Sequence, residues 1–162
     1  MPDAAPDQAR AMWAADAASA ALGMQLVELG PGRARVSMVV RPDMVNGHDL
    51  CHGGLIASLA DSAFALACNS RGPVTVAAGF EVDFLEPARL GQVLEADARE
   101  VALRGRSGLY DVTVRVGDTV VAEFRGRSRS LRRLLGALRP REGDLRPWPP
   151  RATGSPCATS RA

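Results

Sequence analysis

Apolar and polar residues alternate along several short segments of the chain, a pattern typical of strands with one buried face. One such segment is 33–41, in which Ala34, Val36 and Met38 alternate with basic and polar residues. It follows a Gly-Pro-Gly turn and therefore predicts a hairpin with the preceding segment 24–29. Turn residues also separate four later strands, which are predicted at 74–85, 93–101, 107–116 and 120–130.

A long apolar segment, 55–68, separates the first hairpin from these later strands. It exceeds the usual length of a strand and is apolar nearly all round, so it predicts a buried helix. A further, Ala-rich helix is predicted over 7–22, where Gly23 ends it. A mainly antiparallel sheet that wraps one buried helix is an α+β arrangement.

These patterns divide the chain into three parts. We expect an N-terminal helix over 1–23, a single domain over 24–131 and a disordered tail over 132–162. The tail is expected because 139–162 consists mainly of Pro, Gly, Arg, Ser and Thr without periodicity. The chain has 162 residues, about the size of one ordinary domain.

Charge and cysteine content narrow the classes of function. A net charge of +2 is nearly balanced, whereas binding to nucleic acid needs a concentrated basic surface, so nucleic acid is not an expected partner. Three cysteines without the spacing of a disulfide scaffold, and an N-terminus unlike a signal peptide, favour the reducing cytoplasm. No apolar run reaches membrane-spanning length, so a membrane is not an expected partner either.

One acidic residue inside the apolar helix is the strongest candidate for chemistry. Asp61 lies about two helical turns after Gly53, among residues that are almost all apolar. An ionised carboxylate is costly there unless it has a partner. Asp61 is therefore a catalytic base or nucleophile, or else a carboxylate on a solvated stripe or paired with an Arg. Gly53 and Gly54 either form a plain turn or present backbone N–H groups that polarise a carbonyl oxygen.

The loop before this helix offers further polar candidates. His52 is a general acid, a residue that orients an amide, or a cap of the helix, while Asn46 is also common in turns. His48 and Asp49 lack a fourth ligand and zinc-like spacing, so a metal site is not expected. Cys51 adjoins His52, whereas catalytic Cys–His pairs normally converge from separate segments, so a thiol nucleophile is not expected.

These residues, in this order, strongly resemble the phenylacetic acid degradation (PaaI-type) thioesterases of the hotdog superfamily. The resemblance extends from about Leu22 to Leu131. It rests on the loop, the helix and the strands that follow, through Asn46, His52-Gly53-Gly54, Asp61, Ala63, Phe64, Ala67, Cys68, Asn69, Phe84, Pro87, Ala88, Gly91, Gly105-Arg106, Tyr110-Asp111-Val112, Val121-Ala122 and Phe124-Arg125-Gly126. What it implies is a hotdog fold, in which an antiparallel sheet wraps around one long buried helix.

The same resemblance implies an activity. The substrate would be an acyl-CoA, such as phenylacetyl-CoA or hydroxyphenylacetyl-CoA, with no separate cofactor because coenzyme A is part of the substrate. Asp61 would act as general base or nucleophile, and the Gly53 amide would polarise the thioester carbonyl. Asn46 would help to place the attacking water, with His52 in support. Both roles of Asp61 fit the same residues.

An assembly is implied as well. Two subunits would join their sheets, a tetramer would form from two such dimers, and each active site would lie between subunits. Asp61 would come from one subunit and Gly53 from its neighbour. This chain departs from the family at Gly79, near the place where members often carry a hydroxyl residue.

Two other functions are compatible with the pattern. A non-catalytic acyl-CoA-binding module would use the same fold, although it would be expected to have lost the acid or gained a DNA-binding domain. A hotdog dehydratase would need a His aligned with the acid, for which His48 or His52 is available. The arginines of the tail, carried by a short helix around Leu134, Leu135 and Leu138, are an alternative contact for the coenzyme A phosphates.

Overall fold

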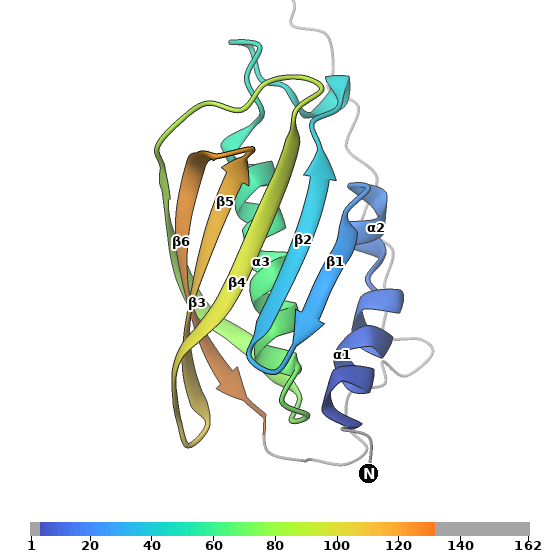
Figure 1. Ribbon diagram of the computed structural model, residues 1–162, viewed down its shortest axis with the longest axis vertical. Helices are drawn as coiled ribbons and strands as arrows, with labels where there is room; N and C mark the ends of the chain where they lie inside the picture. Colours follow the sequence, from blue (N-terminus) through green and yellow to red (C-terminus); the bar gives the residue numbers. More distant parts are fainter. Residues whose placement is uncertain (1–3, 132–162) are drawn as a thin grey trace, which may run out of the picture. The chain divides into compact units, whose positions relative to one another are not determined.

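Six antiparallel strands form one sheet, and a single long helix, α3 (Gly53–Asn69), packs against one of its faces (Figure 1). The computed structural model describes residues 4–131, so the tail expected over 132–162 lies outside the described residues. Across the sheet the strands are β1 (Gln25–Gly30), β2 (Arg33–Val39), β4 (Val93–Arg104), β5 (Ser107–Val116), β6 (Thr119–Ser130) and β3 (Thr75–Phe84).

The alternating segments form strands as predicted. Along β2, the side chains of Ala34, Val36 and Met38 are buried, while those between them reach the outer face. The α+β arrangement of an antiparallel sheet around one long helix is confirmed. The helix begins two residues earlier than predicted because the imidazole of His52 caps it, with Nδ1 accepting the Gly54 N–H at 3.1 Å.

The N-terminal segment differs from its prediction. The single helix expected over 7–22 is two helices, α1 (Ala4–Ala14) and α2 (Ala17–Ala21). The break follows from Asp16, whose carboxylate accepts the Ser19 N–H at 3.0 Å and the Ser19 hydroxyl at 2.6 Å. An aspartate that caps a new helix start in this way ends the preceding helix. Gly23 then ends α2 with a φ of +70°, as expected.

The core lies between α3 and the sheet. On α3 the side chains toward the sheet are buried, among them Leu59, Phe64 and Leu66, which are fully buried. The opposite side of the helix, which includes Ser58 and Asp61, is only half-buried. The prediction of a helix buried nearly all round therefore holds for the side that faces the sheet.

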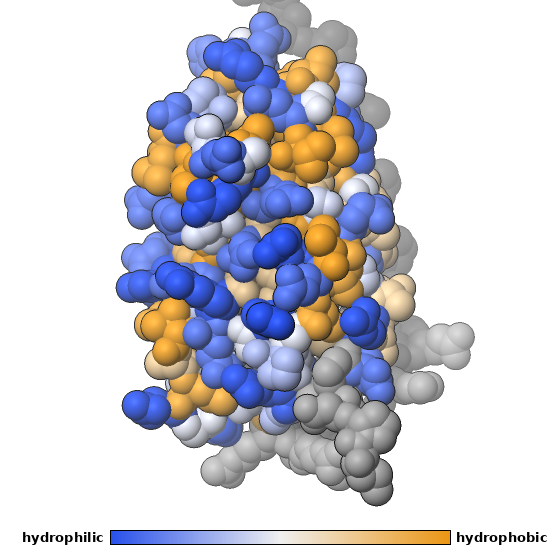
Figure 2. Space-filling model, in the orientation of Figure 1, coloured by the Kyte–Doolittle hydropathy of each residue, from blue (hydrophilic) through white to orange (hydrophobic). Residues whose placement is uncertain are grey.

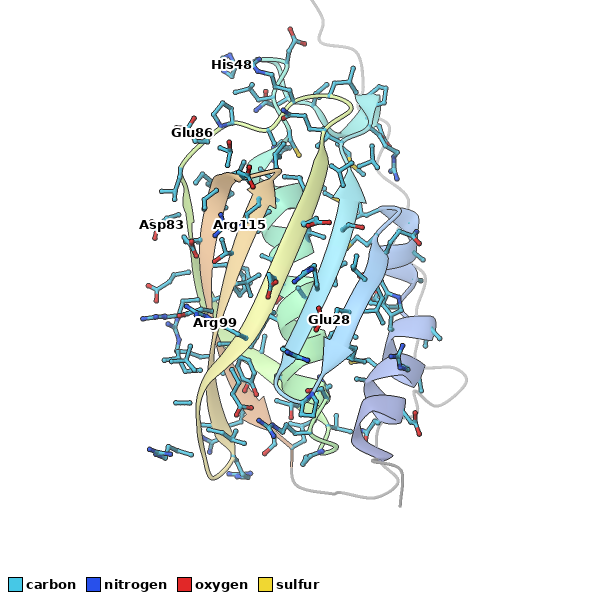
Figure 3. All side chains as sticks on the ribbon, in the orientation of Figure 1. Glu28, His48, Asp83, Glu86, Arg99 and Arg115 are labelled. Atoms are coloured by element: carbon cyan, nitrogen blue, oxygen red, sulfur yellow. The ribbon has the colours of Figure 1, made fainter. Side chains whose placement is uncertain are left out.

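The outer face of the sheet is lined with charged side chains that pair across neighbouring strands. Arg35 meets Asp97 at 2.9 Å, and Arg125 meets Asp111 at 2.7 Å. Figure 2 shows a mainly hydrophilic surface with separate apolar patches, and Figure 3 labels Arg99 among the charged residues of this region. No helix within residues 4–131 is long and apolar enough to span a bilayer.

β3 is an edge strand that pairs only with β6 within the described residues. Its exposed apolar side chains include Val76 at 43%, Phe80 at 45% and Phe84 at 52% exposure. A long edge with unpaired backbone groups and apolar side chains favours pairing with another chain.

A close contact between Phe64 and Gly126 seats α3 on the sheet. A Cβ added at Gly126 would lie 2.9 Å from three atoms of the Phe64 ring. The ring is fully buried and tilts against Tyr110 and Phe124, with centroids 5.4 and 5.9 Å away, so it has little room to move.

We therefore expect Gly126→Ala to lower the free energy of unfolding by about 1–3 kcal/mol, the usual cost of overpacking a core. Gly47→Ala is the matched control, because nothing lies within 4 Å of the added Cβ. It should leave stability unchanged or slightly higher. Urea unfolding measures both, and equal stabilities of the two variants would contradict this role of Gly126.

Candidate active site

The N-terminus of α3 leaves one backbone donor available. The His52 carbonyl accepts the N–H groups of Leu55 and Ile56 at 2.9 and 3.3 Å, and its imidazole accepts that of Gly54. The Gly53 N–H has no acceptor within residues 4–131. A free N–H at the positive end of a helix dipole is suited to an oxyanion or a polarised carbonyl.

Gly53 lies in close contact with the ring of Phe84. A Cβ added there would lie 3.0 Å from Phe84 Cζ, 3.2 Å from Cε2 and 3.4 Å from Cε1. The Cζ end of one face of the ring therefore lies over the Gly53 backbone, where a side chain would push the ring aside. This contact joins the end of β3 to the start of α3.

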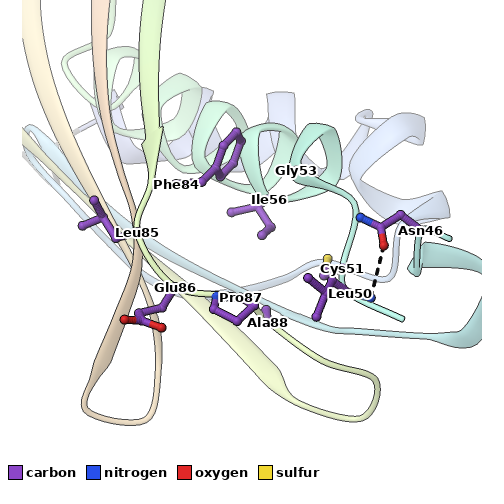
Figure 4. A pocket seen from close by; sticks show the side chains of 10 residues that line it. All are labelled: Asn46, Leu50, Cys51, Gly53, Ile56, Phe84, Leu85, Glu86, Pro87 and Ala88. Atoms are coloured by element: carbon purple, nitrogen blue, oxygen red, sulfur yellow. Dashed lines mark hydrogen bonds between the residues drawn. The ribbon is translucent and has the colours of Figure 1, made fainter. Parts of the chain in front are cut away.

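A pocket of about 310 Å³ opens beside this contact (Figure 4). Most of its lining is apolar, and its polar members are Asn46, Glu86 and the Gly53 backbone. The lining residues are Asn46, Leu50, Cys51, Gly53, Ile56, Phe84, Leu85, Glu86, Pro87 and Ala88. Such a lining suits an apolar group that carries one polar atom.

Asn46 is held in place by the loop that it organises. Its Oδ1 accepts the N–H of His48 at 2.9 Å and that of Leu50 at 3.3 Å, and its own N–H donates to the Leu50 carbonyl at 2.7 Å. Figure 4 shows the amide nitrogen turned away from these bonds, toward the pocket. The loop thus fixes a donor at the pocket wall.

Asp61 is a half-buried carboxylate whose Oδ1 is buried without a hydrogen-bond partner among residues 4–131. Burial raises the pKa of this carboxyl group. Asp61 makes no ion pair with an arginine within the described residues, so that alternative is not supported. Asp61 lies about 12 Å further along the helix axis than Gly53, at 1.5 Å per residue, and it does not line the pocket.

The other candidates of the loop have local roles. His52 caps α3 through Nδ1, which leaves its proton on Nε2 in the neutral form. His48 projects from the loop (Figure 3). Cys51 is buried and burial raises the pKa of its thiol, so the thiolate is disfavoured. Within residues 4–131 no three metal-ligating side chains gather in a group.

Gly79 sits at an irregularity in the pairing of β3 with β6 and has a φ of +154°. A Cβ at this position would lie 3.4 Å from Nη2 of Arg127. Arg127 in turn meets Glu81 at 3.4 Å on the outer face. The position where the family often carries a hydroxyl is therefore beside a guanidinium in this chain.

Similarity to known proteins identifies the family. A family model described as the thioesterase superfamily matches residues 48–123. The acyl-coenzyme A thioesterase PaaI of Escherichia coli is 44% identical over 121 residues, which cover 74% of this chain and 86% of that protein. The chain belongs to the thioesterase superfamily. The predicted PaaI-type thioesterase is thereby confirmed.

Solved structures of similar proteins share the fold. The E. coli PaaI protein from the phenylacetic acid degradation operon has a TM-score of 0.77 and 41% identity, covering 79% of this chain and 94% of that one. A Streptococcus mutans protein bound to acetyl-CoA has a TM-score of 0.64 and 26% identity, covering 67% and 88%. Human acyl-coenzyme A thioesterase 13 is 30% identical over 62% of this chain and 74% of that protein. The hotdog fold is confirmed.

One residue of this thioesterase pocket gained no individual role from the sequence. The sequence indicates Phe84 only through the family resemblance, yet its ring contacts Gly53 from a distant strand. The signal in the sequence was a large apolar residue at the end of an edge strand, which does not reveal what it contacts.

The raised pKa of Asp61 leads to a prediction about stability. The folded state holds the Asp61 proton more tightly than the unfolded chain does, so ionisation destabilises the fold as pH rises above the ordinary value of 3.8. Asp61→Asn should therefore raise the free energy of unfolding at pH 7, and the gain should shrink as pH falls toward 3.8.

Asp111→Asn is the control of opposite sign. The hydrogen bond from Arg125 lowers the pKa of Asp111, so this substitution should lower stability at pH 7. Urea unfolding at several pH values measures both effects. A loss of stability in Asp61→Asn at pH 7 would show that the carboxylate has a stabilising partner.

Proposed function

We propose that this thioesterase hydrolyses an aryl acyl-CoA, such as phenylacetyl-CoA or hydroxyphenylacetyl-CoA, to the free acid and coenzyme A. The observation that carries the proposal is the carboxylate of Asp61, which is half-buried and has an unpartnered oxygen. The available Gly53 N–H and the apolar pocket beside it support a thioester substrate. The name of the E. coli relative, an acyl-coenzyme A thioesterase, supports coenzyme A as the leaving group.

Each active site would be shared between two subunits. A group that polarises a carbonyl and a base that delivers water to its carbon must both lie within a few ångströms of that carbonyl. The axial distance of about 12 Å between Gly53 and Asp61 is too long for this within one chain. A two-fold pair of subunits would bring Asp61 of one helix to Gly53 of the other.

The exposed edge of β3 supports such a pair. Its backbone groups are free on one side within the described residues, and Val76 and Phe80 are exposed along it. Joining two copies at this edge would extend the sheet and cover the apolar side chains. A tetramer built from two such dimers is the assembly that we propose.

In this site the chemistry needs few groups. The thioester oxygen would accept the Gly53 N–H, and Asn46 would hold the attacking water through its free amide nitrogen. Asp61 would take the proton of this water, whose oxygen bonds to the carbonyl carbon before the C–S bond breaks and the thiolate leaves. Direct attack by Asp61, giving an anhydride that water then opens, fits the same geometry. His52 would support the site by capping α3.

The two rival functions have less support. A dehydratase needs a histidine aligned with the acid, but Nδ1 of His52 is engaged in the cap and His48 projects from the loop. A module that only binds acyl-CoA has no use for a buried carboxylate without a partner, which costs stability. Hydrolysis gives that carboxylate a function.

The cytoplasm remains the proposed location. Cys51 and Cys68 are both free thiols, and the nearly balanced charge of the chain still gives no reason to expect nucleic acid. Coenzyme A would take part only as a portion of the substrate.

The first test of the proposal removes the carboxylate. Asp61→Asn should remain folded and lose about 10²-fold or more in kcat for phenylacetyl-CoA, the scale of a positioned acid–base group. Asp118→Asn, in the exposed turn between β5 and β6, is the control and should keep wild-type turnover. Release of free thiol measures both rates, and a folded Asp61→Asn enzyme with normal kcat would rule out this mechanism.

The second test removes the amide donor. Proline fits the first position of a helix, and the extended His52 backbone (ψ 127°) accommodates a following proline. Gly53→Pro therefore deletes the N–H and should lower kcat by about 10²–10³-fold. Gly53→Ala keeps the N–H and places the same Cβ against Phe84, so its loss should be much smaller.

Mixing these inactive variants tests the shared site. When Asp61→Asn and Gly53→Pro subunits are unfolded and refolded together, half of the randomly formed dimers contain one intact site, so about a quarter of wild-type activity should return. Light scattering should show an oligomer throughout. No recovery, or a monomeric mass, would contradict a site built from two subunits.

A further inference from the structure

The ring of Phe84 is the one large aromatic surface of the pocket (Figure 4). Phe84 is the last residue of β3, opposite Ala122 of β6, and its side chain is 52% exposed. A Cβ added at Gly53 would lie almost equally far from Cζ, Cε2 and Cε1, so the Cζ end of one ring face lies over Gly53. The other face of the ring points away from the Gly53 backbone.

Phe80 provides an internal comparison on the same strand. It is similarly exposed, at 45%, but its ring is stacked on Phe124 with the centroids 4.8 Å apart. Phe84 has no aromatic partner within residues 4–131. It also lines the pocket, whereas Phe80 does not. The free face of Phe84 is thus available to a molecule that enters the pocket.

The position of the Phe84 ring relative to the Gly53 amide determines which part of a bound acyl group can contact the ring. An acyl group whose carbonyl oxygen accepts the Gly53 N–H has its next atoms beside the Phe84 ring, because the Cζ end of the ring lies over Gly53 itself. In an arylacetyl group a single methylene separates the carbonyl carbon from the ring. Because this separation is short, the flat ring of the substrate lies beside Phe84, where offset stacking of the two rings is favourable.

We propose that Phe84 is a specificity-determining residue, whose ring face selects aryl over alkyl acyl groups held at the Gly53 amide. The inference rests on the proposed function and deepens it. Ile56 and Leu85, which also line the pocket, supply apolar contact that any acyl group gains. Only the aromatic face distinguishes a flat ring from a chain of similar size.

The experiment compares phenylacetyl-CoA with hexanoyl-CoA. Phe84→Leu keeps the wall apolar but removes the aromatic face, so the ratio of the two kcat/KM values should fall roughly three- to tenfold. Phe84→Tyr restores an aromatic face and should restore the ratio. Phe80→Leu is the matched control on the same strand and should leave the ratio unchanged, with the oligomeric mass of every variant checked by light scattering.

Binding provides a second readout that does not require turnover. Calorimetry measures the Kd values of both thioesters for two proteins, the Asp61→Asn variant and the double variant Asp61→Asn/Phe84→Leu. The ratio of Kd values should change in the same direction and to a similar extent as the kinetic ratio.

The outcomes separate the two proposals. Phenylacetyl-CoA left intact by the wild-type enzyme would refute the proposed substrate, while the Kd ratio would still decide the role of Phe84. An unchanged ratio in Phe84→Leu, or an equal change in Phe80→Leu, would overturn the role of Phe84 and leave Asp61 hydrolysis untouched. If Phe84→Leu does not fold, Phe84→Trp and Phe84→Met replace it. The proposal expects the ratio of the two kcat/KM values to stay unchanged in Phe84→Trp, which keeps an aromatic ring, and to fall in Phe84→Met. Equal ratios in these two variants would reject the proposal.

Discussion

The fixed spacing along α3 is the constraint on which the rest of the site depends. A helix is rigid, so the free Gly53 N–H at its start and the Asp61 carboxylate two turns later stay about 12 Å apart in every state of one chain. Neither group has a hydrogen-bond partner among residues 4–131. A thioester can engage both only if a second copy of the helix is present. The exposed edge of β3, with its apolar side chains, is an edge of the sheet that such a copy can extend.

Two contacts between the face of a phenylalanine ring and a glycine backbone hold this helix on the sheet. Phe64 of α3 points onto Gly126 of β6, and Phe84 of β3 points onto Gly53 of α3. The first pair is fully enclosed and fixes the packing of the core. The second pair lies at the open end of the helix, where Gly53 meets the ring at Cζ rather than at its centre and the ring remains half-exposed. The same kind of contact thus packs the helix in the core, through Phe64 and Gly126, and forms the wall of a pocket at the helix end, through Phe84 and Gly53.

Local patterns account for most of the fold. Alternation along β2 and β5 predicts their buried faces because a strand places successive side chains on opposite sides. The break at Asp16 was not predicted because a run of alanines favours one helix, and only the Ser19 hydrogen bonds show where the second one starts. Asp61 stands out in sequence because charge is rare in an apolar segment. Phe84 does not, since its importance depends on contact with Gly53, which is distant along the chain.

The same burial that makes Asp61 costly also suits it to its proposed role. Desolvation raises the pKa of the carboxyl group, and a carboxylate that holds a proton more tightly is a stronger base toward water. A compensating hydrogen bond or arginine would recover stability, but it would also lower the pKa and occupy the oxygen needed for proton transfer. Asn69, the last residue of α3, shows the contrast, because its buried amide donates to the Ala65 and Thr75 carbonyls and accepts the Thr75 N–H. The helix therefore satisfies the buried polar side chain of Asn69, which has only a structural role, and leaves unsatisfied the carboxylate of Asp61, to which we assign the chemistry.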